Sequence, residues 1–267
     1  MLEATWCPGC GNFGIWQVLK NAFVNLSLSA KDAVVVFDIG CNSNMFNWLE
    51  MTSFESLHGR TLPVASGIKI INPKLSVLAV AGDGGCYGEG GNHLLHAAKH
   101  NLDLTLLVHN NQVYALTTGQ TSPTSARGFK SKSTPAGSFD LALNPLAVAI
   151  AAGASFVARG FAGDLPHLTD LMTQAVKHKG FAIVDILQPC VSFNNVNTFD
   201  WFRQRIYKME QKPANKLAAL EKALEFPQNG TDAKIPIGIF FQEEREVFQP
   251  ETVEFKPEIE RFLAEFL

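Results

Sequence analysis

The sequence predicts an α/β protein built on a doubly wound, mainly parallel sheet. Short, unbroken apolar runs have the composition of strands that are buried on both faces of such a sheet. They lie at residues 33–38, 76–82, 104–110, 155–159 and 181–187. Segments that we expect to be helices lie at residues 12–26, 90–101 and 164–179. Because strands and helices alternate, right-handed strand–helix–strand units should place helices on both faces of the sheet.

The elements can be followed in chain order. The first helix, "NFGIWQVLKNAFVNL", repeats its large apolar residues at helical spacing, and the β-branched run "AVVVFD" comes next. The strands "SVLAVAG" and "LTLLVHN" then enclose the helix "GGNHLLHAAKHN". The strands "SFVAR" and "FAIVDIL" enclose the helix "DLPHLTDLMTQAVKHK". We therefore expect a sheet with at least these strands and one helix before the first of them.

Two long segments interrupt the alternation. Residues 41–74 contain no clear strand, and residues 116–140 are rich in Ser, Thr, Gly and Pro. Loops of that length inside a compact domain are usually functional. We expect one α/β domain over residues 1–195. A helical and extended tail over residues 196–267, with helices at "TFDWFRQRIYKMEQ" and "KLAALEKALE", should pack on this domain or on a partner subunit.

Composition excludes several classes of protein. The chain has 267 residues, 46% of them hydrophobic, and a net charge of −3, which favours neither nucleic acid nor an anionic membrane as a partner. The longest uncharged stretch, residues 141–158, is interrupted by polar residues, Pro and Gly and does not resemble a membrane span. The N-terminus lacks a basic segment followed by an apolar run. We expect a soluble, cytoplasmic protein.

A glycine-rich stretch follows the second predicted strand. In "GDGGCYGEGGNH", Gly82, Asp83 and Gly84 come at the carboxyl end of the strand, where open α/β sheets bind ligands. A P-loop would need Lys-Ser/Thr after the glycines, and a dinucleotide fingerprint would need a glycine where Tyr87 stands. A diphosphate bridged by Mg²⁺ remains, with a glycine-rich turn and a capping aspartate as the structural alternative.

The next strand supplies a second oxygen ligand. It ends in Asn110-Asn111, and Asn111 follows Asp83 by 28 positions, about the length of one strand–helix–strand unit. The two strand ends should therefore lie side by side. The pair resembles the thiamin diphosphate motif, a Gly-Asp-Gly followed by an Asn. By that resemblance Asp83 and Asn111 bind Mg²⁺ through their side chains, and Val113 binds it through its backbone carbonyl.

The resemblance extends over nearly the whole chain, to about Arg245. "WCPGCG", "DIGCNSN", "HGRTLPVASGIKIINPKL" and "GEGGNHLLHAAKHNLDLTLLVHNNQVYALTTGQTSPTS" are similar to the β subunits of 2-oxoacid:ferredoxin oxidoreductases. The resemblance implies a thiamin diphosphate-binding fold. It also implies a cofactor site formed by Gly40, Cys41, His58, Gly82, Asp83, Gly84, Gly85, Asn111, Val113, Tyr114, Ala115, Leu116 and Thr117.

Gly85, His58 and Glu89 lie within or beside these motifs. Gly85 stands where many relatives carry a second aspartate. The resemblance places His58 near the cofactor and the substrate carbonyl, as a candidate catalytic residue. The alternative is a loop histidine that is bonded to backbone. Glu89 lies near the start of a predicted helix, where a structural role in the helix dipole suffices.

The cysteines form a second candidate site. Cys7-x-x-Cys10 alone fits a redox pair, half of a zinc site or half of an iron–sulfur site. The resemblance implies that Cys7, Cys10, Cys41 and Cys190 bind one [4Fe–4S] cluster, and it assigns no role to Cys86. The spacing of the four does not match a compact ferredoxin motif. Buried, inert cysteines are the alternative.

The resemblance implies oxidative decarboxylation of a 2-oxoacid to an acyl-coenzyme A and CO₂, with electrons leaving through the cluster to ferredoxin. An α subunit should supply the pyrimidine-binding domain and an activating glutamate, and γ or δ subunits can accompany it. Two alternatives stay open: a non-redox thiamin diphosphate-dependent 2-oxoacid decarboxylase subunit, and a magnesium–diphosphate-binding module without catalysis.

Overall fold

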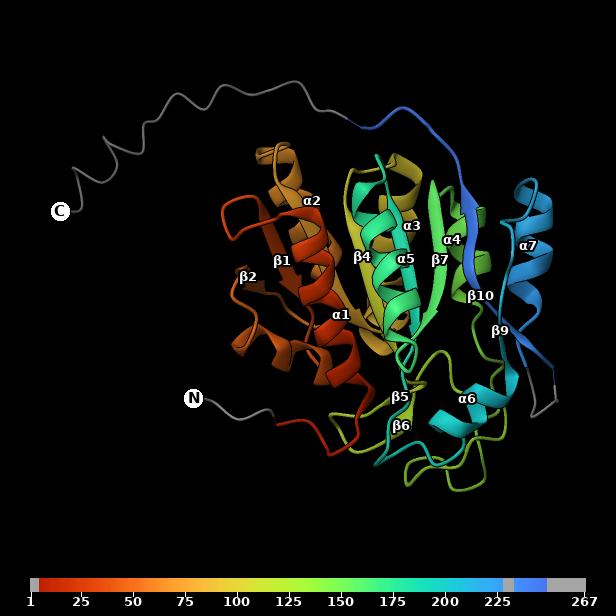
Figure 1. Ribbon diagram of the computed structural model, residues 1–267. Coiled ribbons are helices and arrows are strands. Elements are labelled where there is room, and N and C mark those ends of the chain that lie inside the picture. Colours follow the sequence, from red (N-terminus) through yellow and green to blue (C-terminus); the bar gives the residue numbers. More distant parts are fainter. Residues whose placement is uncertain (1–4, 228–232, 249–267) are drawn as a thin grey trace.

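A sheet of eight strands forms the centre of the structure, a computed structural model that describes residues 5–227 and 233–248. The strand order is β2-β1-β3-β4-β8-β7-β10-β9, and neighbours are parallel except for β7 and β10 (Figure 1). The strands are β1 (Ala33–Phe37), β2 (Thr52–Glu55), β3 (Ser76–Gly82), β4 (Thr105–Asn110), β7 (Phe156–Phe161), β8 (Ala182–Leu187), β9 (Ile206–Lys208) and β10 (Ile235–Gln242). A separate hairpin pairs β5 (Val113–Tyr114) with β6 (Gln120–Thr121).

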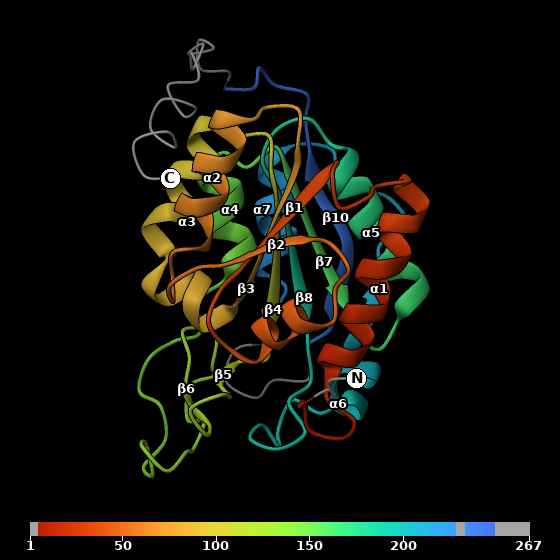
Figure 2. The same ribbon diagram turned by 90° about the vertical axis from the view of Figure 1, so that its left-hand side faces the viewer.

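Helices cover both faces of this sheet (Figure 2). On one face lie α1 (Gly11–Leu26) and α5 (Leu165–Lys177). On the other lie α2 (Thr61–Ile71), α3 (Gly91–His100), α4 (Pro145–Ala152) and α7 (Lys216–Leu224). Each face has its own cluster of buried apolar side chains, so the sheet separates two halves of the core. The remaining helical segments are α6 (Phe199–Arg205), a 3₁₀ turn at Cys41–Asn47 and a π-helical turn at Gly84–Glu89.

The predicted fold class is confirmed. The predicted apolar runs form β1, β3, β4, β7 and β8, with ends shifted by no more than two residues. Every residue of β1, β4, β7 and β8 is buried, as expected for strands covered by helices on both sides. No helix in the described ranges is both long enough and apolar enough to span a membrane.

The prediction missed strands at the two edges of the sheet. β2 lies inside the segment that was predicted to lack a strand; it is short, mostly exposed and polar, so it has no apolar run to reveal it. The helix that was predicted to continue past Arg205 ends there, because Ile206, Tyr207 and Lys208 pair with β10 instead. Pairing with another strand overrides local helix propensity at this point.

The predicted tail joins the central sheet. β10 pairs antiparallel with β7 on one side and parallel with β9 on the other. Pro236 and Gly238 interrupt its apolar pattern, which is why its sequence did not stand out as a strand. Residues 249–267 of the predicted tail lie outside the described residues, and the division of the chain at residue 195 stays a prediction.

Candidate functional site

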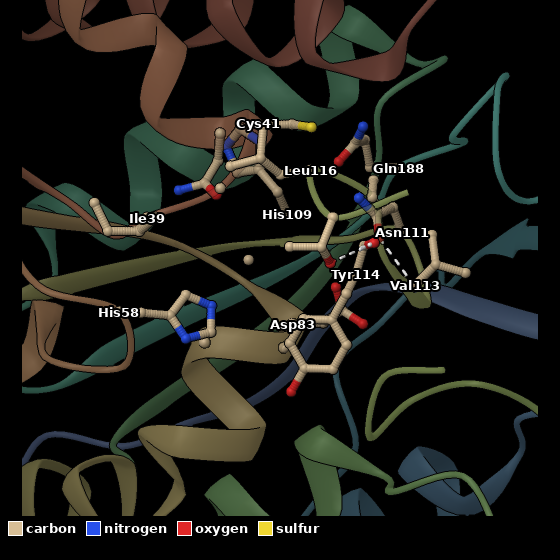
Figure 3. A pocket seen from close by; sticks show the side chains of 17 residues that line it. Ile39, Cys41, His58, Asp83, His109, Asn111, Val113, Tyr114, Leu116 and Gln188 are labelled. Atoms are coloured by element: carbon tan, nitrogen blue, oxygen red, sulfur yellow. Dashed lines mark hydrogen bonds between the residues drawn. The ribbon is translucent and has the colours of Figure 1, made fainter. Parts of the chain in front are cut away.

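A cavity of about 520 Å³ opens at the carboxyl ends of β1, β3 and β4 (Figure 3). Part of this space is open to solvent. All residues predicted to form the cofactor site line it: Gly40, Cys41, His58, Gly82, Asp83, Gly84, Gly85, Asn111, Val113, Tyr114, Ala115, Leu116 and Thr117. Ile39, Asn42, His109 and Gln188 line it as well. Their roles in binding remain predictions, but the fold brings all of them to one place.

Asp83 lies at the floor of this cavity, directly after β3, and only 1% of it is exposed. The hydroxyls of Ser122 and Thr124 both donate to its Oδ2 atom, each at 2.6 Å. Since both bind the same oxygen, Oδ1 is the atom left for a metal ion. Burial raises the pKa of Asp83 to about 6, and the two hydroxyls oppose the shift. A cation beside this carboxylate would offset the cost of burying its charge.

A buried network continues from Asp83 into the sheet. The Thr124 hydroxyl also lies 2.9 Å from Oδ1 of Asn110, whose Nδ2 donates to Asp185 at 3.0 Å. Asp185 in turn accepts from Arg159 at 3.4 Å, and both of these side chains are 1% exposed. The floor of the cavity is therefore connected to an ion pair between β7 and β8.

Asn111 and Val113 are oriented by the residue between them. Gln112 has a φ of 62°, which is uncommon for a residue other than glycine. Ser125 Oγ donates to the Gln112 carbonyl at 2.6 Å, and Gln112 Nε2 donates to the Thr124 carbonyl at 3.2 Å. Oδ1 of Asn111 accepts from the Val113 N–H at 3.0 Å (Figure 3). This tight turn places the side chain of Asn111 and the backbone of Val113 beside each other at the cavity.

Gly85 is required by Asp38, the residue directly after β1. A Cβ atom at residue 85 would overlap the carboxylate of Asp38. Asp38 is fully buried, and its Oδ2 atom has no hydrogen-bond partner among the described residues. Burial raises the pKa of Asp38, and the Gly59 N–H and His58 oppose the shift. The side chain that Gly85 lacks is thus replaced in space by a carboxylate from the neighbouring strand.

His58 lies at the rim of the cavity, in the loop between β2 and α2, and 35% of its side chain is exposed. Its Nδ1 atom is 3.4 Å from Oε2 of Glu89, and its ring centroid is 6.2 Å from that of Tyr114. Burial raises the pKa of the Tyr114 hydroxyl, and the Glu89 carboxylate adds to the shift. The hydroxyl therefore stays protonated and donates to Glu89.

Three of the four cysteines predicted to bind a cluster can be related to this cavity: Cys41 lines it, Cys190 packs with Cys41, and Cys10 accepts a hydrogen bond from Gln188, which also lines it. Cys41 lines the cavity and lies in one apolar cluster with Cys190, Val113 and Ala115. Burial raises the pKa of Cys10 and of Cys41 to about 11, and the charges of Cys190 and Cys7 add to both shifts. Within residues 5–227 and 233–248, however, no three His, Cys, Asp or Glu side chains are close enough together to hold a metal ion. The cluster stays a prediction.

Two family models match this chain. The C-terminal thiamine pyrophosphate-binding domain of thiamine pyrophosphate enzymes matches residues 38–186. The C-terminal region of the pyruvate ferredoxin oxidoreductase beta subunit matches residues 190–256. The 2-oxoacid:ferredoxin oxidoreductase subunit beta of a Sulfolobus species is 42% identical over 250 residues, which are 90% of this chain and 82% of the relative. The chain belongs to the family of 2-oxoacid:ferredoxin oxidoreductase β subunits.

Other members of this β-subunit family agree. The 2-oxoglutarate synthase subunit KorB of Methanocaldococcus jannaschii is 32% identical over 95% of this chain and 91% of its own length. A solved 2-oxoglutarate:ferredoxin oxidoreductase from Magnetococcus marinus, with 2-oxoglutarate, coenzyme A and succinyl-CoA bound, superposes with a TM-score of 0.87. It is 31% identical and is matched over 98% of this chain and 88% of that one. The resemblance stated from the sequence is confirmed.

Sequence analysis of this β subunit missed several residues of the site. Ser122 and Thr124 lie in the loop that was predicted to be functional, but nothing in that polar loop distinguishes them from its other hydroxyl residues. Glu89 was assigned a structural role, and its contacts with His58 and Tyr114 require the loop and the hairpin to meet at the turn. Cys86, to which the resemblance assigned no role, is buried in the core on the α2 and α3 face.

Proposed function

We propose that this β subunit binds thiamin diphosphate and Mg²⁺ in the cavity and takes part in the oxidative decarboxylation of a 2-oxoacid to an acyl-coenzyme A. One observation carries the proposal: Asp83, Asn111, Gly84 and Gly85 share a single cavity with Cys41, which is one of the four cysteines predicted to bind the cluster. A diphosphate site and a redox site would then be adjacent.

The donor set fits a magnesium–diphosphate. Asp83 offers one free carboxylate oxygen, Asn111 an amide oxygen and Val113 a backbone carbonyl, and Mg²⁺ prefers a few such oxygens with phosphate oxygens completing its coordination. Gly84 and Gly85 leave the turn without side chains on the cavity wall. When bound, thiamin diphosphate supplies the nucleophile for the 2-oxo carbon and accepts the electron pair that CO₂ leaves behind.

This chain's own residues would bind and orient these groups. The hydroxyls of Ser122 and Thr124 hold Asp83 in place, and the buried network behind them resists rotation. Ile39, Leu116 and Val113 contribute apolar side chains to the lining of the cavity. His58 is a titratable side chain on the rim that can hold or move a proton beside the substrate carbonyl.

Cys7, Cys10, Cys41 and Cys190 would hold a [4Fe–4S] cluster. Four thiols fit such a cluster or zinc, and the family favours the cluster. When bound, it accepts electrons one at a time and passes them towards ferredoxin. Gln188 donates to Cys10 Sγ at 3.4 Å and also lines the cavity, which supports a short path between the two sites.

Partners complete the proposal. An α subunit should carry the pyrimidine-binding domain and the activating glutamate, and coenzyme A should take the acyl group. Further γ or δ subunits can accompany the αβ unit, and the assembly should work in the cytoplasm. The chain alone should not turn over a 2-oxoacid.

The test uses the complex co-expressed with its α subunit and purified without oxygen. Thiamin diphosphate should co-purify with the wild-type complex and be lost in Asp83→Ala. Retention of thiamin diphosphate by the Asp83→Ala complex would refute the assignment. Activity against a panel of 2-oxoacids with a viologen acceptor then identifies the substrate.

The cluster is tested in the same preparation. About four irons per β chain and an EPR signal after reduction are expected. Replacing Cys7, Cys10, Cys41 or Cys190 with serine should lose iron and viologen reduction together, whereas the control Cys86→Ser should keep both. A complex that decarboxylates without iron would instead be the non-redox decarboxylase.

A further inference from the structure

Glu89 joins two walls of the cavity. It is the last residue of the π-helical turn after Asp83, and 47% of its side chain is exposed. Oε2 is 3.4 Å from Nδ1 of His58, which comes from the loop after β2. The Tyr114 hydroxyl, from β5, donates to Oε1 at 3.1 Å and lies 3.3 Å from Oε2. One carboxylate therefore contacts a cavity-lining side chain on each side.

The backbone around His58 is fixed independently of this carboxylate. The Gly59 N–H donates to Oδ1 of the buried Asp38 at 2.8 Å. Gly59 also packs so closely on Glu89 that a Cβ atom there would be 2.6 Å from Glu89 Cβ. Arg60 Nη1 donates to the Gly59 carbonyl at 3.2 Å and to the Glu89 carbonyl at 3.5 Å. The Glu89 carboxylate contacts the imidazole ring itself, so it can orient the ring without holding the backbone.

The ring has a defined direction. Figure 3 shows one ring nitrogen of His58 directed towards the other labelled residues of the cavity and the second directed away from them. Since Nδ1 is the atom beside Glu89, Nε2 is the atom that faces the cavity. A carboxylate accepts and cannot donate, so a carboxylate oxygen 3.4 Å from Nδ1 favours a ring that carries a proton on this nitrogen. Nε2 of the neutral ring is then a free acceptor.

Stability does not account for these contacts. Even when His58 is charged, an ion pair between two half-exposed side chains such as these contributes only about 0–1 kcal/mol. A residue that costs little in stability but sets the direction of a ring at a reaction site is a candidate for positioning.

We propose that Glu89 is a positioning residue for the 2-oxoacid: it holds His58 with Nδ1–H towards its own carboxylate and Nε2 towards the substrate, and it holds the Tyr114 hydroxyl away from the cavity floor. The inference rests on the proposed function. It assigns Glu89 to the substrate step and leaves cofactor retention to Asp83 and Asn111.

Steady-state kinetics of the co-expressed complex test this role. Glu89→Gln should lower kcat/KM for the 2-oxoacid by roughly 10-fold, the lower end of losses seen when a residue that orients a functional histidine is replaced. Thiamin diphosphate affinity should stay within about 2-fold of wild type, since Glu89 does not contact the floor of the cavity. Unchanged kcat/KM, or loss of thiamin diphosphate together with activity, would overturn the proposal.

Glu225→Gln is the matched control. Glu225 is also 47% exposed, accepts from a tyrosine hydroxyl (Tyr207, 2.8 Å) and pairs with a cationic side chain (Lys222, 2.7 Å), but it lies at the end of α7 and does not line the cavity. This variant should keep wild-type kcat/KM. An equal loss in both variants would show a general effect of removing such a charge and would overturn the proposal.

A double-mutant cycle asks whether Glu89 acts through His58. In a His58→Gln background, Glu89→Gln should change kcat/KM by less than about 2-fold, because the ring that it orients is absent. Fully additive losses would overturn the proposal.

A structure of the cofactor-free Glu89→Ala complex provides a readout without turnover. The imidazole should leave its present position while Gly59 and Arg60 stay, since Asp38 still holds that backbone. An unmoved ring would count against the proposal. If the wild-type complex itself contained no thiamin diphosphate, the proposed function would fail and this assignment with it, which separates that failure from a defect confined to Glu89.

Discussion

The hydroxyl of Thr124 offers a sharp test of how the floor of the cavity is built. Thr124→Val removes a donor 2.6 Å from Oδ2 of Asp83 and keeps the volume of the side chain. Thr124 is 2% exposed and Asp83 1%, so bulk water cannot take the place of the lost bond. The hydroxyl has one proton, and an ionised Asp83 is a stronger acceptor than the Asn110 amide oxygen 2.9 Å away.

The size of the effect follows from the charge of the acceptor. A hydrogen bond to a charged group contributes about 1.5–3 kcal/mol, and about 1.4 kcal/mol corresponds to a factor of ten in affinity. Without the bond, Asp83 can turn away from the metal position in the unloaded protein, and cofactor binding has to reverse that movement. We expect Thr124→Val to weaken binding of thiamin diphosphate with Mg²⁺ by about 10- to 100-fold.

The assay is a calorimetric titration of thiamin diphosphate, at fixed Mg²⁺, into the complex after its cofactor has been removed with a chelator. Thr134→Val is the control, because Thr134 lies in the same loop but bonds to Ser131 at 2.8 Å instead of Asp83. The control should bind within about 2-fold of wild type. Wild-type affinity in Thr124→Val would refute the view that this hydroxyl positions the ligand.

Three further substitutions test the interior. Asp185→Asn leaves the buried guanidinium of Arg159 without a counter-charge and should cost about 3–5 kcal/mol, seen as a lower Tm, whereas adding Arg159→Met should recover most of it. Gly85→Ala places a methyl group on the carboxylate at the end of β1 and should destabilise the chain by about 1–3 kcal/mol in denaturant titrations. Burial of the Asp103 carboxyl favours a higher pKa, but the hydrogen bond and charge of Lys69, together with the Gly180 N–H and the charge of Lys179, lower the pKa of Asp103. Because a lowered folded-state pKa stabilises the protein above the unfolded value near 4, the Tm deficit of Lys69→Met should be largest at neutral pH and shrink as the pH falls below about 4.

The sequence revealed those parts of the site that follow from strand ends. Asp83 and Asn111 were predicted to lie together because neighbouring parallel strands end at one edge, and β3 and β4 are neighbours. The glycines and the residues after Asn111 came from the family motif, and all of them line the cavity. Predictions of this kind need only strand order and a local pattern.

Contacts made by loops and edges were not predictable in this way. Ser122 and Thr124 reach Asp83 across about 40 residues of chain, through a loop whose path no periodicity describes. Asp38 looked like the end of a strand, and its place in the space beside Gly85 depends on the distance between β1 and the turn. Edge strand β2 is mostly exposed, so its sequence lacks the apolar run by which the buried strands were recognised.

The two parts of the cavity differ in a way that separates their functions. Asp83 on the floor is tied through Thr124 and Asn110 to a buried ion pair, and each of these groups is nearly inaccessible to solvent. His58 and Glu89 on the rim are partly exposed, and their side-chain contacts, with each other and with Tyr114, lie at the edge of the cavity. A rigid floor suits a resident cofactor, whereas a rim with adjustable side chains suits a substrate that enters and leaves. Thr124→Val should therefore weaken cofactor binding more than it lowers kcat of the saturated enzyme, and Glu89→Gln should do the reverse. If both variants lost cofactor affinity and turnover in the same proportion, the floor and the rim would not have separate functions.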